Sequence, residues 1–246
     1  MQKWIPEGQA YTVTFVPTDD FQFDGWGAGF PPEGDARYVS TTVAACNGSA
    51  TFSPVYKSII CVAKSGDDET GNGTAANPFL TIAKAMATAK SRDVIRIQTG
   101  LYEESVTNTA LQELTIEGGY TANWTRDLRN APTTIRPPSN KLPCVYINNV
   151  NSNVVKGLVL TGGSYGIVAY GQSGRRDSAG AGGHAGCAAR NHRLVSLVIT
   201  NNVSHGVEGN KVMINGVRVI SSLIAFNGGN GANFGGDTTS PSYIQN

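Results

Sequence analysis

A short apolar strand that ends in a glycine or asparagine corner recurs along the second half of the chain. The clearest copies are LTIEGG at 114–119, LVLTGG at 158–163, LVITNN at 197–202 and LIAFNG at 223–228. Glycine and asparagine tolerate the left-handed backbone that a sharp corner needs. A strand repeating in this way is typical of a solenoid, in which each coil buries its apolar face on its neighbours.

The spacing of these strands gives the expected coil length. The strand centres lie at Ile95, Thr115, Ile135, Val159, Val198 and Ile224. Most steps between them correspond to coils of about 20–26 residues. The long step from Val159 to Val198 contains GQSGRRDSAGAGGHAGCAARN, which has no strand pattern. We therefore expect an inserted loop over about residues 171–190, and we expect Asn201 and Asn227 to stack at successive corners.

The start of the solenoid carries several spaced motifs. They are SGDDETGNGT at 65–74, NPFLTIAKAM at 77–86 and DVIRIQTGLYEE at 93–104. Apolar residues at helical spacing predict a helix over about 79–90, and Pro78 suits its first turn. The strand pattern then begins again at Val94.

This order of motifs resembles the opening of bacterial pectate-lyase-like β-helix proteins, in which a helix caps the first coil. The segment GGYTANWTRDLRNAPTTI at 118–135 also resembles a recurring element of such proteins, where it lies in a loop after the second coil. The resemblance implies an all-β, right-handed parallel β-helix of the pectin-lyase-like type over residues 61–246, with an N-terminal capping helix.

Residues 1–60 read as a separate, small β-rich module. Tyr11, Val13 and Phe15 alternate with their neighbours at the two-residue period of a half-buried strand. The run YTVTFVPTDDFQFDGWGAG and the closing strand ATFSPVY resemble a divergent internalin-type B repeat of bacterial surface proteins. Only MQKWIP precedes the matched segment, so the resemblance implies a partial repeat.

Composition narrows the compartment and the partners. Charged residues make up 15% of the 246 residues, and 19 basic residues face 18 acidic ones. This balance shows no electrostatic footprint for nucleic acid, and no apolar run is long enough to span a membrane. The N-terminus lacks the pattern of a signal peptide. We expect a piece of a longer secreted or cell-surface bacterial protein, cut rather than finished at its C-terminus.

The four cysteines leave two alternatives open. Bridges Cys46–Cys61 and Cys144–Cys187 are compatible with a secreted chain. Four buried thiols are an equally good interpretation. No CxxC pair and no zinc-type histidine spacing occurs.

Candidate ligand-binding residues cluster in and around the inserted loop. They comprise Arg175, Arg176, Asp177, His184 and His192, together with the aromatic residues Tyr120, Trp124, Tyr165 and Tyr170, whose rings could stack on sugars. A glycine-rich excursion without function is the alternative for the loop. Asp67, Asp68 and Glu69 could bind Ca²⁺, or they could form a polar solvated turn. Ser204-His205-Gly206 resembles the Gly-His-Gly of polygalacturonases, but the accompanying aspartate motifs are missing, which favours a structural histidine.

Three functions compete. The first is a non-catalytic part of a surface protein that serves adhesion or contacts a polysaccharide or cell-surface glycan. The second is a polysaccharide lyase or glycoside hydrolase whose catalytic coils lie partly outside this chain. The third is a structural spacer. The few carboxylates favour the first over the second, because a calcium-dependent lyase or a glycosidase needs several of them on one face.

Overall fold

The computed structural model describes residues 10–14, 21–26, 40–44, 54–170, 172–173, 187–188, 192–209, 217–234 and 243–245. The chain divides into two compact units, Met1–Ile59 and Ile60–Asn246. In the first unit, β1 (Ala10–Thr14) pairs antiparallel with β3 (Ser40–Ala44). Strand β2 (Phe21–Trp26) pairs antiparallel with β4 (Pro54–Val62), which runs on into the second unit.

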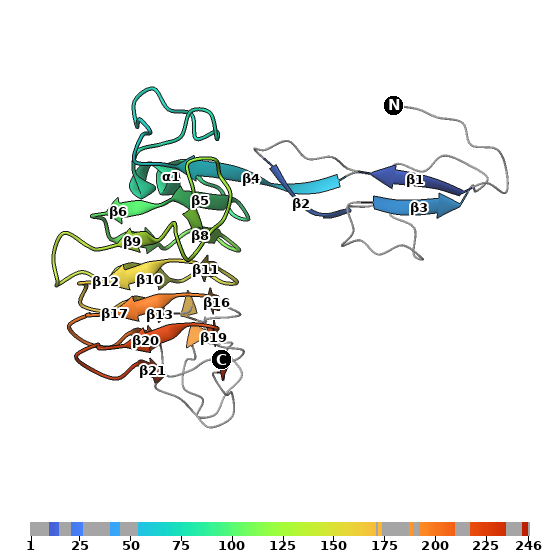
Figure 1. Ribbon diagram of the computed structural model, residues 1–246. Helices are drawn as coiled ribbons and strands as arrows, with labels where there is room; N and C mark the ends of the chain where they lie inside the picture. Colours follow the sequence, from blue (N-terminus) through green and yellow to red (C-terminus); the bar gives the residue numbers. More distant parts are fainter. Residues whose placement is uncertain are drawn as a thin grey trace, which may run out of the picture. The chain divides into compact units, whose positions relative to one another are not determined.

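The second unit is a parallel β-helix whose coils each contribute one strand to each of three sheets (Figure 1). We name the sheets after the strands of the first coil. The β5 sheet contains β5 (Val94–Gln98), β8 (Thr115–Tyr120), β11 (Val154–Lys156), β16 (His192–Val195), β19 (Val217–Ile220) and β22 (Tyr243–Gln245), with β4 and β2 beyond β5.

The other two sheets each hold five strands. The β6 sheet contains β6 (Gly100–Tyr102), β9 (Thr133–Ile135), β12 (Val159–Thr161), β17 (Val198–Thr200) and β20 (Leu223–Ala225). The β7 sheet contains β7 (Val106–Asn108), β10 (Val145–Asn148), β13 (Ile167–Tyr170), β18 (Val207–Gly209) and β21 (Ala232–Phe234). The predicted all-β parallel β-helix is therefore confirmed.

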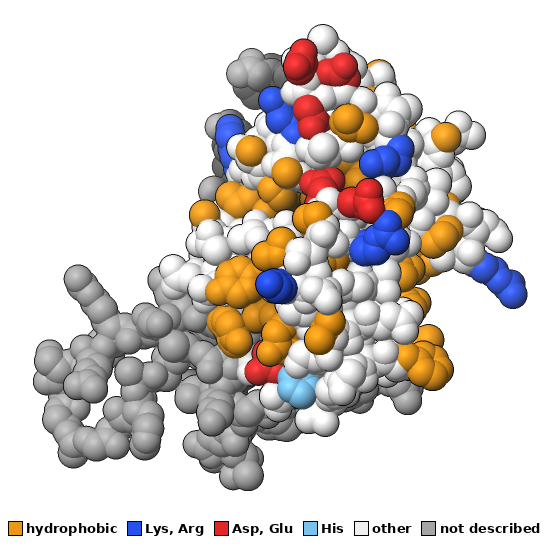
Figure 2. Space-filling model, turned by 90° about the vertical axis from the view of Figure 1, so that its left-hand side faces the viewer, with side chains coloured by type: hydrophobic (Ala, Val, Ile, Leu, Met, Phe, Trp, Pro, Cys, Tyr) orange, Lys and Arg blue, Asp and Glu red, His pale blue; other side chains and the backbone are white. Residues whose placement is uncertain are grey.

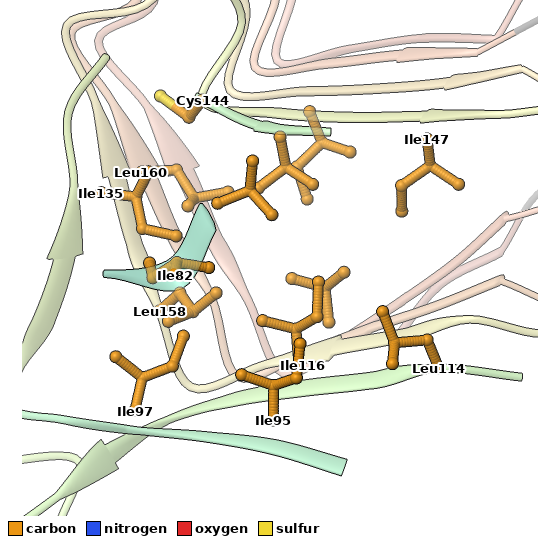
Figure 3. Close-up of a cluster of buried hydrophobic side chains, with 14 of the residues drawn as sticks. Ile82, Ile95, Ile97, Leu114, Ile116, Ile135, Cys144, Ile147, Leu158 and Leu160 are labelled. Carbon is orange, nitrogen blue, oxygen red and sulfur yellow. The ribbon is translucent and has the colours of Figure 1, made fainter. Parts of the chain in front are cut away.

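Aliphatic side chains fill the space between the sheets. On the β5 sheet, Ile95, Ile116, Val155, Leu194 and Val219 occupy one in-register row, and each is almost completely buried. Figure 3 shows side chains of the β5 sheet and of the β6 sheet meeting in this interior. Because strand side chains alternate between faces, the neighbours of this row point outward.

A short helix covers the first coil. Helix α1 (Ile82–Thr88) is shorter than the predicted 79–90, because Phe79 instead forms a bridge with Val62 of β4. The side-chain oxygen of Thr81 caps the helix by accepting a hydrogen bond from the Lys84 N–H. Glu104 accepts further bonds from the free N–H groups of Ile82 and Ala83. No helix in the described part of the chain is long and apolar enough to cross a membrane.

Asparagines stack at one corner, displaced by one residue from the prediction. Asn202 lies beside Asn227, and its Nδ2 donates a hydrogen bond of 2.9 Å to Asn227 Oδ1. Asn201 instead takes a left-handed backbone, with φ of 54°, in the same corner position as Phe226. The prediction aligned Leu197 with Leu223, but the strands pair Val198 with Leu223, a step of 25 residues.

The first coils are longer than the sequence spacing suggested. Ile95 and Thr115 belong to the β5 sheet, whereas Ile135 and Val159 belong to the β6 sheet. The second coil contains the connection from Tyr120 to Thr133, so the sequence pattern counted one coil too many. The segment 118–135 thus includes a loop within this coil, as the resemblance implied.

Two short strands lie in the predicted insertion, where β14 (Gln172–Ser173) pairs antiparallel with β15 (Cys187–Ala188). Cys144 is a free, buried thiol, so the Cys144–Cys187 bridge is not formed. Its Sγ–H group donates to Asn202 Oδ1, and burial raises the pKa of the thiol to about 12. Cys61 is buried in β4, and Cys46 lies outside the described residues.

The interior row makes a direct stability prediction. Leu160 is fully buried on the β6 sheet, so Leu160→Ala should lower the free energy of unfolding by about 2–5 kcal/mol. Val198, on the next strand, points outward and is 36% exposed, so Val198→Ala should change it by less than about 1 kcal/mol. Urea unfolding of both variants measures the difference, and equal losses would contradict the assignment of the two faces.

Candidate functional site

The outer face of the β7 sheet gathers aromatic and polar side chains from successive coils. Strand pairing places Thr107, Tyr146, Val168, Glu208 and Asn233 in one row. The alternate positions, such as Val145, Ile167 and Val207, are buried in the core. The row therefore presents a tyrosine, a carboxylate and an amide on strands that lie about 4.8 Å apart.

Two more tyrosines extend this row sideways. Tyr170 follows the row on β13, and its ring packs edge-on against that of Tyr146 with centroids 6.2 Å apart. Tyr165 lies at the preceding corner, and its ring centroid is 6.0 Å from that of His205. We call these five residues, Tyr146, Tyr165, Tyr170, His205 and Glu208, the tyrosine surface. Figure 2 shows hydrophobic side chains gathered on one face beside an acidic and a histidine side chain.

Hydrogen bonds fix the polar part of the tyrosine surface. The Asn230 backbone N–H donates to His205 Nδ1 at 2.7 Å, so in the neutral ring the proton sits on Nε2. That Nε2 lies 3.9 Å from Glu208 Oε2, which also accepts a hydrogen bond from Asn233 Nδ2 at 3.0 Å. Burial raises the pKa of Tyr170 above its usual value, and the nearby Glu208 carboxylate raises it further. The phenol hydroxyls therefore remain neutral donors and acceptors.

This arrangement combines the two kinds of contact that a sugar needs. Half-buried tyrosine rings offer apolar faces whose rotamers are held by their neighbours, so little conformational entropy is lost when a ligand packs on them. Glu208, Asn233 and the tyrosine hydroxyls offer hydrogen-bond partners for sugar hydroxyls. The five strands of the β7 sheet contain a single acidic residue, Glu208.

The predicted aromatic residues are thus divided between two places. Tyr165 and Tyr170 belong to the tyrosine surface. Trp124 lies elsewhere, because its Nε1 donates to the Ala75 carbonyl at 3.0 Å and ties two loops together. Tyr120 is 6% exposed, so its ring cannot serve as a binding platform.

His192 is an interior residue rather than a ligand contact. It is completely buried, and its Nδ1 accepts a hydrogen bond from the Asn153 N–H. The Nε2 atom has no hydrogen-bond partner, and neither has the Nδ2 atom of Asn153. Burial lowers the pKa of His192 to about 4, so the ring is neutral at pH 7. Arg175, Arg176, Asp177 and His184 lie outside the described residues and stay predictions.

The carboxylates proposed for Ca²⁺ serve the chain itself. Asp67 Oδ1 accepts hydrogen bonds from the backbone N–H groups of Glu69 and Thr70, which lower its pKa. Asp68 accepts bonds from Leu80 and Thr81 at the start of the helix. Among the described residues, no three histidine, cysteine or acidic side chains form a group that could hold a metal ion. The residues therefore do not fit a calcium cradle.

A second polar group, missed from the sequence, lies on the outer face of the β5 sheet. Glu117 is 3% exposed and accepts a bond of 2.9 Å from Arg96 Nε, together with bonds from the Lys156 ammonium and the Tyr120 hydroxyl. Burial alone would raise the pKa of Glu117, but these three donors outweigh burial and hold the pKa below its usual value. Arg96, Glu117 and Lys156 come from three consecutive coils in register.

Comparison with known proteins adds little about function. Residues 64–118 match a family described as a protein of unknown function, DUF1565. This stretch covers the loop, the helix and the first coil, where the sequence motifs were most closely spaced. No curated protein and no solved structure matches the chain.

The buried histidine predicts a pH dependence of stability. Because the pKa of His192 is about 4 in the folded state and about 6.5 when unfolded, only the unfolded chain takes up this proton between those values. Stability from the neutral ring is complete above pH 6.5 and falls by about 3 kcal/mol as the pH drops to 4. Urea unfolding at both pH values should show a loss smaller by this amount in His192→Gln. An identical pH dependence in both proteins would contradict the buried neutral ring.

Proposed function

We propose that the β-helix is a non-catalytic carbohydrate-binding part of a secreted or cell-surface protein, and that it binds a glycan on the tyrosine surface. The observation that carries the proposal is the gathering of Tyr146, Tyr165 and Tyr170 beside Glu208 and His205 on one sheet face. A rigid scaffold that presents aromatic rings and hydrogen-bond partners across several coils suits a chain-like ligand. Membership of the β-helix fold alone would not support it, because the fold serves many functions.

Binding is favoured over hydrolysis by the inventory of the same surface. A glycosidase uses two carboxyl groups flanking the scissile bond, about 5–9.5 Å apart. The strands of the β7 sheet provide Glu208 alone, and its oxygens already face Asn233 and His205. Aromatic contact together with one fixed carboxylate can hold a sugar without breaking a bond. A spacer, in contrast, would need no such surface.

Replacing two of the rings tests the proposal. A glycan array with the wild-type chain should identify a bound oligosaccharide, and titration calorimetry then gives its Kd. Tyr146→Ala combined with Tyr170→Ala should weaken binding by about tenfold, because two apolar faces are lost.

The matched control is Tyr56→Ala, which removes a 53% exposed tyrosine that packs on Phe21, away from this sheet. It should leave the Kd unchanged, and circular dichroism should show intact strands in all variants. An array without any bound glycan, or equal weakening by Tyr56→Ala, would count against the proposal.

A further inference from the structure

Two arginines face each other without a carboxylate on the outer face of the β5 sheet. Strand pairing puts Arg193 of β16 directly opposite Arg218 of β19, and both side chains are exposed. The neighbouring positions His192, Leu194, Val217 and Val219 are buried, which fixes the two arginines on the outside. Within the described part of the chain, neither arginine forms an ion pair.

The same sheet shows what pairing looks like when it is provided. Two strands toward the N-terminus, Glu117 is held between Arg96 and Lys156. From β5 to β22, the strands of this sheet carry four arginine or lysine residues and one acidic residue, Glu117. The whole chain has a net charge of only +1. Positive charge is therefore concentrated on this face.

The facing arginines cost stability unless an anion joins them. Like charges directly opposite on neighbouring strands repel each other, and strands in a sheet are about 4.8 Å apart. Replacing either residue by a neutral one would remove the repulsion, so packing alone does not account for the pair. A carboxylate or sulfate group placed between two guanidinium groups would accept charge-assisted hydrogen bonds from both.

We propose that this cationic face, formed by Arg193, Arg218, Lys156 and Arg96, binds an acidic polysaccharide through its carboxylate or sulfate groups. The outward residues of β11, β16 and β19 are Val154, Lys156, Arg193, Val195, Arg218 and Ile220. They include no aromatic ring on which a nucleic-acid base could stack. The proposal concerns a different sheet from the tyrosine surface, so either site can exist without the other.

Polymers that share one backbone test the proposal. Titration of the full chain with dextran sulfate, carboxymethyl dextran, unmodified dextran and single-stranded DNA compares sulfate, carboxylate, neutral and nucleic-acid ligands. At least one charged dextran should bind, with an affinity that falls as salt is added, while neutral dextran should not. Arg193→Gln combined with Arg218→Gln should weaken that binding by about tenfold.

The matched control removes two positive charges elsewhere. Lys90→Gln with Lys141→Gln changes two exposed lysines outside the sheet and should retain the wild-type Kd. Tyr146→Ala with Tyr170→Ala should also retain it, which separates this site from the tyrosine surface. No binding of either charged dextran, equal loss in the lysine control, or tighter binding of DNA would overturn the proposal.

Thermal unfolding gives a second readout. Because Arg193 and Arg218 repel each other, Arg218→Gln should keep or raise the Tm. Arg218→Glu places a carboxylate opposite Arg193, so it should raise the Tm and also weaken binding of the charged dextran. A lower Tm in both variants would show that Arg218 holds the fold together, and would overturn the proposal.

Discussion

Register between successive coils is the constraint on which every other feature of this β-helix depends. Parallel hydrogen bonding sets residue against residue, as in the pairing of Val198 with Leu223, and it repeats with a step of 25 residues in the last complete coils. A shift by one residue would turn the buried row of Ile95 and Ile116 outward and the charged row of Arg96 and Glu117 inward. Burial of the aliphatic rows thus selects the register, and the register then places the outer side chains.

The two outer surfaces follow from this constraint without further design of the backbone. Tyr146 and Glu208 lie 62 positions apart in the numbering, yet they share one row because β13 lies between their strands. On another sheet, the same stacking brings Arg193 against Arg218. Rigid strands hold these side chains at the spacing of the coils. This geometry suits extended ligands, which can contact several coils at once.

The sequence predicted the fold well because the core is periodic. Alternating aliphatic residues and the motifs around Pro78 were sufficient for the parallel β-helix and for a capping helix. Local spacing could not tell which sheet a strand joins, so Ile95 and Ile135 were placed in one series although they belong to different sheets. The same ambiguity shifted the asparagine stack from Asn202 to Asn201.

The outer surfaces were harder to predict for a physical reason. Tyr165 and Tyr170 could be chosen because they are aromatic and close in sequence. Tyr146 and Glu208 gain their meaning only from the pairing of distant strands. A net charge near zero likewise concealed the local excess at Arg193 and Arg218, because charge balance says nothing about position. Aligning the coils by their buried rows, at steps of 25 residues where the pattern is clear, would have revealed both.

A metal bridge across the β6 sheet tests the register most directly. Val198 and Leu223 are exposed and directly opposite, so Val198→His with Leu223→His places two imidazoles about 4.8 Å apart at their backbones. Thermal unfolding with and without Zn²⁺ should show a higher Tm with the metal, because only the folded state joins the two ligands. Val159→His with Leu223→His, two strands apart, should show no such rise. A rise in the second pair but not in the first would contradict the register, and with it the placement of both surfaces.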